Sequence, residues 1–307
     1  MDLSEVDPDL RDATERLRVP DVSRPLIRSV VRAVTAVMPV PRVDGVAVSS
    51  VRARGVRGRA YRPDSRRSDA SLLWVHGGGL VIGNPRQDDA LCAGTARALG
   101  ITVVSVRYGL APEHPFPVAL DQLTAAWDWL QAGADGLCAA PDRVALGGES
   151  AGGGLAAALA QRLLDTRPTQ PIAQWLFAPM LDDRTAADRS LDAVDHRIWN
   201  NVMNRVGWSA YLGDEPGSPA LPEYAAPARR QDLRGLSPVY LAVGDIELFH
   251  DEVVDYGARL TGAGVPVTLD VVPGGPHGFE NWARTTPPAV ALVRRAQDWL
   301  RSVIADA

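Results

Sequence analysis

A serine flanked by small residues lies in the middle of the chain, in the segment Gly148-Glu149-Ser150-Ala151-Gly152. An apolar run over Arg143 to Leu146 precedes it and an alanine-rich run over Leu155 to Leu164 follows it, which predicts a strand, a sharp turn and a helix. The crowded backbone of such a turn needs neighbours with almost no side chain, and the two glycines meet that need. Ser150 is therefore the candidate nucleophile.

A serine nucleophile needs a base to take its proton, and the chain has five histidines: His76, His114, His196, His250 and His277. In a parallel sheet with a serine on a strand-to-helix turn, the catalytic residues follow the order serine, acid, histidine, with the histidine after the last strand. Only His277 fits, because it follows the apolar run Val267 to Val272 and the turn Pro273-Gly274-Gly275-Pro276. We expect it to be the general base.

A glycine-rich loop, His76-Gly77-Gly78-Gly79, directly follows the apolar run Ser71 to Val75. Without side chains in the way, N–H groups of this loop can hold the negative oxygen of a tetrahedral intermediate, together with the N–H of Ala151 after the nucleophile. The loop is a candidate oxyanion hole. We interpret His76 as a structural residue that fixes the loop rather than as a second base.

The acid that orients the base should follow the apolar run Val239 to Val243, where three carboxylates are candidates: Asp245, Glu247 and Asp251. Its role is to accept the imidazole N–H, fix the tautomer and stabilise the imidazolium, which an aspartate or a glutamate can do. The residue types alone leave this choice open.

Four motifs, taken together, resemble those of the hormone-sensitive-lipase family of α/β-hydrolases, the bacterial family IV esterases. They are His76 to Gly79, Tyr108 to Pro117, Gly148 to Gly152 and His277 to Phe279, and they span most of the chain in the family's order. The resemblance implies an α/β-hydrolase fold with a mostly parallel central sheet flanked by helices, a helical cap, and hydrolysis of carboxylic esters. No metal or organic cofactor is expected.

The resemblance also assigns roles to single residues. Gly78 and Gly79, with Ala151, would supply the oxyanion N–H groups, and Gly77 is the secondary candidate.

For the acid, the family has a segment similar to D-P-L-x-D-E. Its last two residues match Asp251-Glu252, and this match aligns Glu247 with the family's catalytic aspartate. The separation of thirty residues between Glu247 and His277 is also similar to that of the family. Asp245 is kept as the alternative acid and would otherwise order the loop.

Two residues depart from the family's pattern. Gly109 stands where the family's Y-R-L-A-P-E segment has arginine, so whatever that arginine braces must be braced otherwise. Glu149 stands beside the nucleophile where aspartate is common, and we interpret it as a hydrogen-bonded or solvated supporting residue.

Strand-like runs and helix-like segments alternate through most of the chain, which predicts an α/β fold with helices on both faces of the sheet. The strand-like runs are Leu72 to Val75, Ile101 to Val106, Val144 to Leu146, Ile172 to Phe177, Val239 to Val243 and Val267 to Val272. The helix-like segments are residues 88–99, 118–131, 151–165, 251–262 and 288–303. Before them, Val46 to Tyr61 has the pattern of a hairpin of edge strands.

Two segments interrupt or precede this alternation and are expected to form a cap. Residues 1–45 are predicted to be helical, with apolar residues from Leu26 to Val37 at helical spacing and an end near Pro39 and Pro41. Residues 181–234 form an insertion without strand signals, and a connection of this length is typically a functional lid. Residues 46–180 and 235–307 would then form the catalytic domain.

Four aromatic residues in the cap or near the catalytic loop could line the substrate pocket: Trp199, Trp208, Tyr211 and Trp282.

The composition excludes other classes of protein. A formal net charge of −5 over 307 residues, without a long run of one sign, argues against nucleic-acid binding. All 32 basic residues are arginine, which excludes lysine Schiff-base chemistry and the Ser-x-x-Lys hydrolases. Cys92 and Cys138 lack the spacing of a zinc site or a disulfide framework. The charged N-terminus and the absence of a long apolar run predict a cytoplasmic protein without stable membrane association.

We therefore expect a serine esterase that acts on short- to medium-chain carboxylic esters through Ser150, His277 and Glu247 and an acyl-enzyme. Its partner is a small-molecule ester, and the family resemblance suggests a homodimer formed through the edge strand Val267 to Val272. The triad does not separate ester hydrolysis from amide or carbamate hydrolysis or acyl transfer. A non-catalytic ligand receptor on the same fold is a further alternative, although such relatives lose a triad member.

Overall fold

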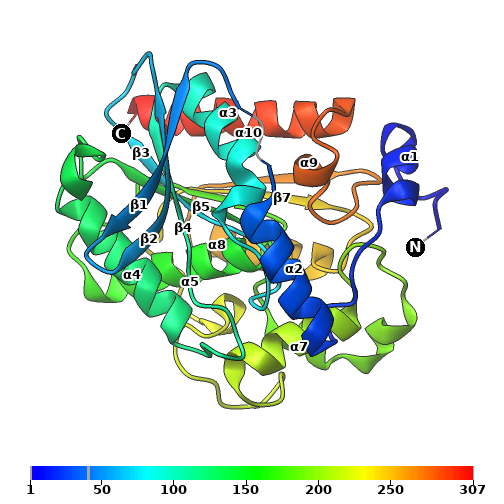
Figure 1. Cartoon of the computed structure of the whole chain (residues 1–307). Coiled ribbons are helices and arrows are strands. Elements are labelled where there is room, and N and C mark those ends of the chain that lie inside the picture. The colour runs from blue at the N-terminus through cyan, green and yellow to red at the C-terminus, as the bar shows by residue number, and fades with distance from the viewer. Residues whose placement is uncertain (1, 40–41, 307) are drawn as a thin grey trace.

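Eight strands form one sheet in the computed structural model, which describes residues 2–39 and 42–306 of the chain (Figure 1). The strands are β1 (Val46–Ala53), β2 (Val56–Pro63), β3 (Ser71–Val75), β4 (Thr102–Val106), β5 (Val144–Glu149), β6 (Gln174–Phe177), β7 (Val239–Gly244) and β8 (Val267–Val272). Their spatial order is β1-β2-β4-β3-β5-β6-β7-β8. The pairs β1/β2 and β2/β4 are antiparallel, and every other neighbouring pair is parallel.

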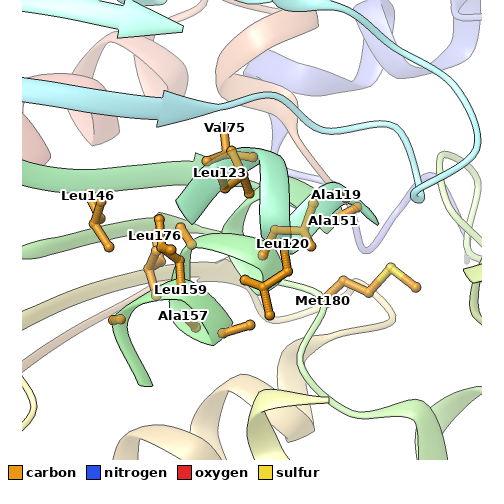
Figure 2. Packing of buried hydrophobic residues seen from close by; sticks show 14 of the residues in the cluster. Val75, Ala119, Leu120, Leu123, Leu146, Ala151, Ala157, Leu159, Leu176 and Met180 are labelled. Carbon is orange, nitrogen blue, oxygen red and sulfur yellow. The ribbon is translucent and has the colours of Figure 1, made fainter. Parts of the chain in front are cut away.

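Helices cover both faces of this sheet because its inner strands are apolar on both sides. Along β3, Leu73 and Val75 belong to one hydrophobic cluster, while Leu72 and Trp74 belong to the other. The first cluster also contains apolar residues of α4 (Val118–Gln131), α5 (Ala151–Thr166) and α8 (His250–Gly262). The second contains those of α3 (Asp89–Leu99) and α10 (Pro287–Asp306). Figure 2 shows part of the first cluster, where Leu120, Leu123 and Leu159 lie close to Val75, Leu146 and Leu176 of the sheet.

The predicted architecture of a mostly parallel sheet between two layers of helices is confirmed. One detail of the hairpin prediction is wrong: β1 is an edge strand, but β2 is internal because it pairs with β4 on its other side. The opposite edge of the sheet is β8.

The N-terminal region contains two helices, α1 (Pro8–Arg16) and α2 (Pro25–Val37). The helix predicted from the apolar spacing is present and ends at Val37, whereas Pro41 lies outside the described residues. The apolar residues of α2 do not all face the protein. Four are exposed to solvent: Leu26, Val30, Val34 and Val37.

The insertion between β6 and β7 contains α6 (Asp183–Ala187), α7 (Asn201–Leu212) and short 3-10 turns, η3 (Arg189–Ala193) and η4 (Pro227–Arg229), and no strand is assigned within residues 181–234. Two more short elements, η1 (Pro85–Asp88) and α9 (Phe279–Trp282), follow β3 and β8. The remaining turn is η2 (Ala134–Gly136).

The loops that follow β3, β5, β6, β7 and β8 all lie at the same edge of the sheet, because these strands run in parallel.

Candidate active site

Ser150 occupies a strained turn between β5 and α5. Its backbone angles, φ 56° and ψ −124°, lie in a region that residues with a side chain rarely adopt. A Cβ atom at Gly148 would overlap the carbonyl of Gly152, and one at Gly152 would overlap the carbonyl of Val75. The turn therefore needs glycine at both positions, and it presents the serine side chain at the carboxyl end of the sheet.

His277, from the loop after β8, reaches this serine. Its Nε2 atom lies 2.9 Å from Oγ of Ser150, and its Nδ1 atom lies 2.9 Å from Oε2 of Glu247. The loop approaches β7 so closely that a Cβ atom at Gly244 would overlap the carbonyl of Gly275. The side chains of Ser150, His277 and Glu247 are each less than a tenth exposed, which shields their hydrogen bonds from water.

The three candidate acids have different surroundings. Glu247 faces the imidazole, and its Oε2 atom also accepts the N–H of Phe249 at 3.0 Å. Asp245 accepts the N–H of Gly274 at 2.7 Å and so holds the turn that leads to the histidine. Asp251 is exposed and pairs with the neighbouring histidine at 2.8 Å. The structure thus brings Glu247 to the imidazole of His277 and places Asp245 on the turn before it.

The glycine-rich loop passes beside the nucleophile, since a Cβ atom at Gly77 would lie 3.4 Å from Cβ of Ser150. Gly78 has φ 122° and Gly79 has φ 56°, which favour glycine. Within the part of the chain that the structure describes, the N–H groups of Gly78, Gly79 and Ala151 donate no hydrogen bond to another protein atom. These three donors are free to hold an oxyanion.

His76 supports this loop. Its ring is completely buried and stacked on the ring of Tyr108, with the two centroids 4.3 Å apart. Its Nδ1 atom lies 2.9 Å from the carbonyl of Gly77, and the Tyr108 hydroxyl donates to the carbonyl of His76 at 2.9 Å. Burial lowers the pKa of His76 to about 4, so the imidazole is neutral near pH 7. These contacts agree with a structural role.

Two of the four predicted pocket aromatics lie against the catalytic loops. The indole ring of Trp199 packs on the backbone of Gly79, where a Cβ atom would overlap it. Trp282 donates its Nε1–H to the carbonyl of His277 at 2.9 Å and so holds the loop of the base.

The other two aromatics, Trp208 and Tyr211 on α7, are buried in the hydrophobic core. Their ring centroids are 6.1 Å apart, and Tyr211 also packs edge-on against Phe116 at 5.7 Å. They therefore attach the insertion to the body of the protein.

A group of buried carboxyl side chains behind the nucleophile was not predicted. The Asn281 amide donates to Oδ1 of Asp88 at 2.8 Å and to Oε2 of Glu149 at 2.9 Å, and the Trp74 indole donates to Oδ2 of Asp88 at 2.7 Å. Glu149 is thus hydrogen-bonded and buried rather than solvated. Glu280 is also buried, and its Oε1 atom has no protein partner among the described residues.

Burial changes the acidity of this group. It raises the pKa of Asp88 to about 7 and that of Glu280 to about 7. Burial, followed by the charges of Glu280 and Asp88, raises the pKa of Glu149 well above its usual range. The only sequence signal for this group was the charged residue next to the nucleophile, because its other members are distant in the chain.

Two more residues at the site were not predicted to have a role there. His196, on the insertion, is half-buried and close enough to Glu247 and His277 for their charges to act on it, and burial lowers its pKa. Glu252 is buried at the start of α8 and accepts the N–H of Leu181 at 2.7 Å, which fixes the start of the insertion.

An arginine of helix α2 braces the segment around Gly109. The guanidinium of Arg32 donates to the carbonyl of Val81 at 2.7 Å and to that of Ala111 at 2.6 Å, and it pairs with Glu113 at 2.9 Å. It thus joins α2 to the segment after the glycine-rich loop and to the segment around Gly109.

Cys92 and Cys138 are free and buried. Among residues 2–39 and 42–306, no group of three or more histidine, cysteine, aspartate or glutamate side chains is arranged to hold a metal ion. None of the helices in those ranges is both long enough and apolar enough to cross a bilayer.

Comparisons with known proteins agree with this geometry. The model of a family described by the α/β hydrolase fold matches residues 72–281. The chain is 36% identical to the carboxylic ester hydrolase LipN of Mycobacterium tuberculosis, over 83% of this chain and 69% of that protein. The structure of a bacterial heroin esterase has a TM-score of 0.91 and 34% identity, over 98% of this chain and 99% of that one. The structure of an esterase from the bacterial hormone-sensitive lipase family has a TM-score of 0.82 and 30% identity, over 97% of this chain and 99% of that one.

Proposed function

The chain belongs to this α/β-hydrolase family and is a carboxylic ester hydrolase of the hormone-sensitive-lipase type, and we propose that it works through a Ser150-His277-Glu247 triad and an acyl-enzyme. Ser150 attacks the ester carbonyl while His277 takes its proton, and Glu247 stabilises the imidazolium. His277 then gives the proton to the leaving alcohol, and a water molecule repeats the sequence on the acyl-enzyme.

The observation that carries this proposal is the pair of hydrogen bonds on one imidazole, 2.9 Å to the serine hydroxyl and 2.9 Å to the carboxylate. The free N–H groups of Gly78, Gly79 and Ala151 support their role as donors to the oxyanion. The loop places Gly77 next to the serine as well, and it remains the secondary donor.

A serine-directed phosphonate tests the proposal. We expect one phosphonyl group per chain on the peptide that contains Ser150, complete loss of turnover of p-nitrophenyl acetate, and no labelling of Ser150→Ala. Labelling of a different residue with loss of activity would overturn it.

The substrates are esters of short- to medium-chain acids. Ser150 is only 5% exposed, and the Trp199 ring packs on the oxyanion loop, so the site favours an acyl chain that fits a confined space. Across p-nitrophenyl acetate, butyrate, octanoate and palmitate, kcat/KM should be highest for one of the first three. A maximum at palmitate would contradict this chain-length preference.

Amide hydrolysis uses the same triad, and we place esters first because of the relatives' activity. Hydrolysis of p-nitroacetanilide at a rate similar to that of p-nitrophenyl acetate would reverse that order.

Acyl transfer is tested by adding an alcohol to the ester assay and measuring the new ester that forms. The intact contact between serine and histidine argues against a non-catalytic receptor.

The N-terminal region, residues 1–45, and the insertion, residues 181–234, form the cap over the catalytic domain of residues 46–180 and 235–307. Three contacts support this division. Trp199 packs on Gly79, Gly207 of α7 packs on the Gly79 carbonyl, and Arg32 of α2 bonds the backbone at Val81.

A homodimer would form through the edge strand β8, whose outer side chains Leu269 and Val271 are exposed. Sedimentation velocity of the protein and of Leu269→Arg tests this. The wild-type chain should sediment as a dimer and the variant as a monomer. A wild-type monomer at every concentration would contradict it.

A further inference from the structure

Two arginines lie opposite each other, one on β2 and the other just past the neighbouring strand β4, close in sequence to Gly109. The N–H of Arg107, just after β4, donates to the carbonyl of Arg57 on β2 at 2.8 Å, and the antiparallel register continues to this pair from Gly58 and Val106. Side chains at directly opposite positions lie close together, and like charges there repel. A ligand of opposite charge would remove that repulsion.

These arginines line a cavity of about 580 Å³ between α2, the start of β2 and the segment from Arg107 to His114. A second hollow of about 200 Å³ shares Arg57, Arg107 and Asn84 with it and adds Arg52 and Arg86. The combined space is large enough for a small organic molecule and not only for a bare ion.

The charge of the cavity is positive. Within the described ranges, Arg57, Arg107 and Arg52 form no ion pair with a carboxylate, whereas Arg32 is paired with Glu113. Glu113 is the sole carboxylate residue that lines either space, and His114 lies beside it. An anion entering the cavity therefore meets unpaired guanidinium groups.

Asn84 supplies an independent observation. Its side chain is 6% exposed, and its Oδ1 atom accepts the N–H of Arg86 at 2.9 Å, which fixes the orientation of the amide. The residue lines both spaces, and its Nδ2 atom is buried at their wall with no partner among the protein atoms described. A buried donor without an acceptor is unfavourable and indicates a missing ligand atom.

Gly109 contributes no side chain to the wall of the cavity, and a Cβ atom there would lie 2.9 Å from Cβ of His114. Gly109 lines the cavity, where members of the family carry arginine. Arg32 bonds the backbone on either side of this position, at Val81 and Ala111.

We propose that this cavity binds a phosphate group through Arg57, Arg107 and the Nδ2 donor of Asn84. A phosphate offers several strong acceptor oxygens and a charge that exceeds one, which suits two facing guanidinium groups and a fixed amide donor. The group is either free phosphate or part of a phosphorylated small molecule, since both present the same oxygens.

The cavity touches the support of the oxyanion loop. Tyr108 lines it and stacks on His76, and Gly83, also in its wall, lies so close that a Cβ there would overlap the carbonyl of Gly77. A ligand held by Asn84 would stabilise this turn, so we expect bound phosphate to raise the Tm.

Isothermal titration of inorganic phosphate and of glycerol 3-phosphate, at constant ionic strength set with chloride, tests the proposal. The protein is first blocked at the active site with a phosphonate, so that binding in the oxyanion hole does not contribute. We expect saturable binding, at least about tenfold weaker in Arg57→Gln and Arg107→Gln because a charge-assisted hydrogen bond is lost. Arg62→Gln, an exposed arginine on the same strand, should bind as the unchanged protein does.

Asn84→Asp is the second variant, because it keeps the oxygen that caps the turn and replaces the free donor by an acceptor. It should fold, as shown by circular dichroism, and lose phosphate binding. Tighter binding of glycerol 3-phosphate identifies a phosphorylated molecule as the ligand, and equal binding identifies free phosphate. Absence of saturable binding, or equal affinities in the Arg57, Arg107 and Arg62 variants, overturns the proposal.

Discussion

The Oε2 atom of Glu247 lies 2.9 Å from Nδ1 of His277, and the same oxygen accepts the N–H of Phe249 at 3.0 Å. The backbone donor holds the carboxylate in the position from which it can receive the imidazole N–H. Asp245, two residues earlier, instead bonds the turn before the histidine. The two carboxylates therefore act on the same histidine in different ways, one on its ring and one on its loop.

Glu247→Gln should lower kcat for p-nitrophenyl acetate by about 100- to 10,000-fold, because the amide can donate to Nδ1 and favour the wrong tautomer. Asp245→Asn should keep kcat within about tenfold, since the amide oxygen can still accept the N–H of Gly274 and only the charge is lost. If the Asp245 variant were inactive and the Glu247 variant nearly normal, Asp245 would be the acid.

Ser150→Gly should stabilise the protein while it abolishes turnover. Glycine adopts φ 56° and ψ −124° without the strain that a side chain causes, which costs on the order of 1–3 kcal/mol. Chemical denaturation should therefore show a higher free energy of unfolding for Ser150→Gly than for Ser150→Ala. Both variants lack the hydroxyl, but only alanine keeps the strain. Equal stabilities would show that the turn is not strained.

Gly79→Ala should lower both activity and stability, because the new methyl group would overlap the Trp199 ring and the residue has φ 56°. Trp199→Leu alone should be active, with a changed preference for the acyl chain. The double variant should recover part of the lost stability, as measured by Tm. No recovery would mean that backbone strain, not the ring contact, dominates.

Local rules made much of the site predictable from the sequence. The serine turn needs glycines within two residues, and the base is expected after the last strand, so short segments were enough to predict Ser150 and His277, which the structure places 2.9 Å apart. The choice of Glu247 required the family's spacing, because the course of the loop decides which carboxylate reaches the ring, and Asp245 is held by Gly274.

Contacts between distant segments could not be predicted. Asn281 joins Asp88, 193 residues earlier, to Glu149, 132 residues earlier, and no periodic pattern encodes such a pairing. The same holds for Arg32, which bonds Ala111 across 79 residues. Apolar spacing predicted helix α2 but not its orientation, and Leu26 is 78% exposed.

Glu280→Gln should make the free energy of unfolding fall less as the pH rises. Burial raises the pKa of Glu280 to about 7, above its ordinary value of 4.5, so the folded chain keeps a proton that the unfolded chain releases. The stabilisation that this proton gives the folded chain is complete below about pH 4.5 and is lost as the pH rises through 7. The variant stays neutral and should be more stable than the unchanged protein at pH 8, by at most about 3 kcal/mol.

Urea denaturation at pH 5 and pH 8 measures this effect, with the exposed Glu223→Gln as the control. The difference between the two pH values should be smaller in Glu280→Gln than in the control. An unchanged difference would mean that Glu280 is ionised in the folded protein at neutral pH.

Arg32→Gln should weaken the attachment of α2 and, through it, the oxyanion loop. The guanidinium bonds two backbone carbonyls and Glu113, and the Ala111 that it holds donates its own N–H to the carbonyl of Leu80, one residue after the glycine-rich loop. We expect a loss of about 1–3 kcal/mol in the free energy of unfolding, earlier proteolysis within residues 25–37, and a kcat several-fold lower. Arg24→Gln, which removes an exposed ion pair from the start of the same helix, should change none of these measurably. Proteolysis and kcat equal to those of the control would show that α2 is held by its apolar contacts alone.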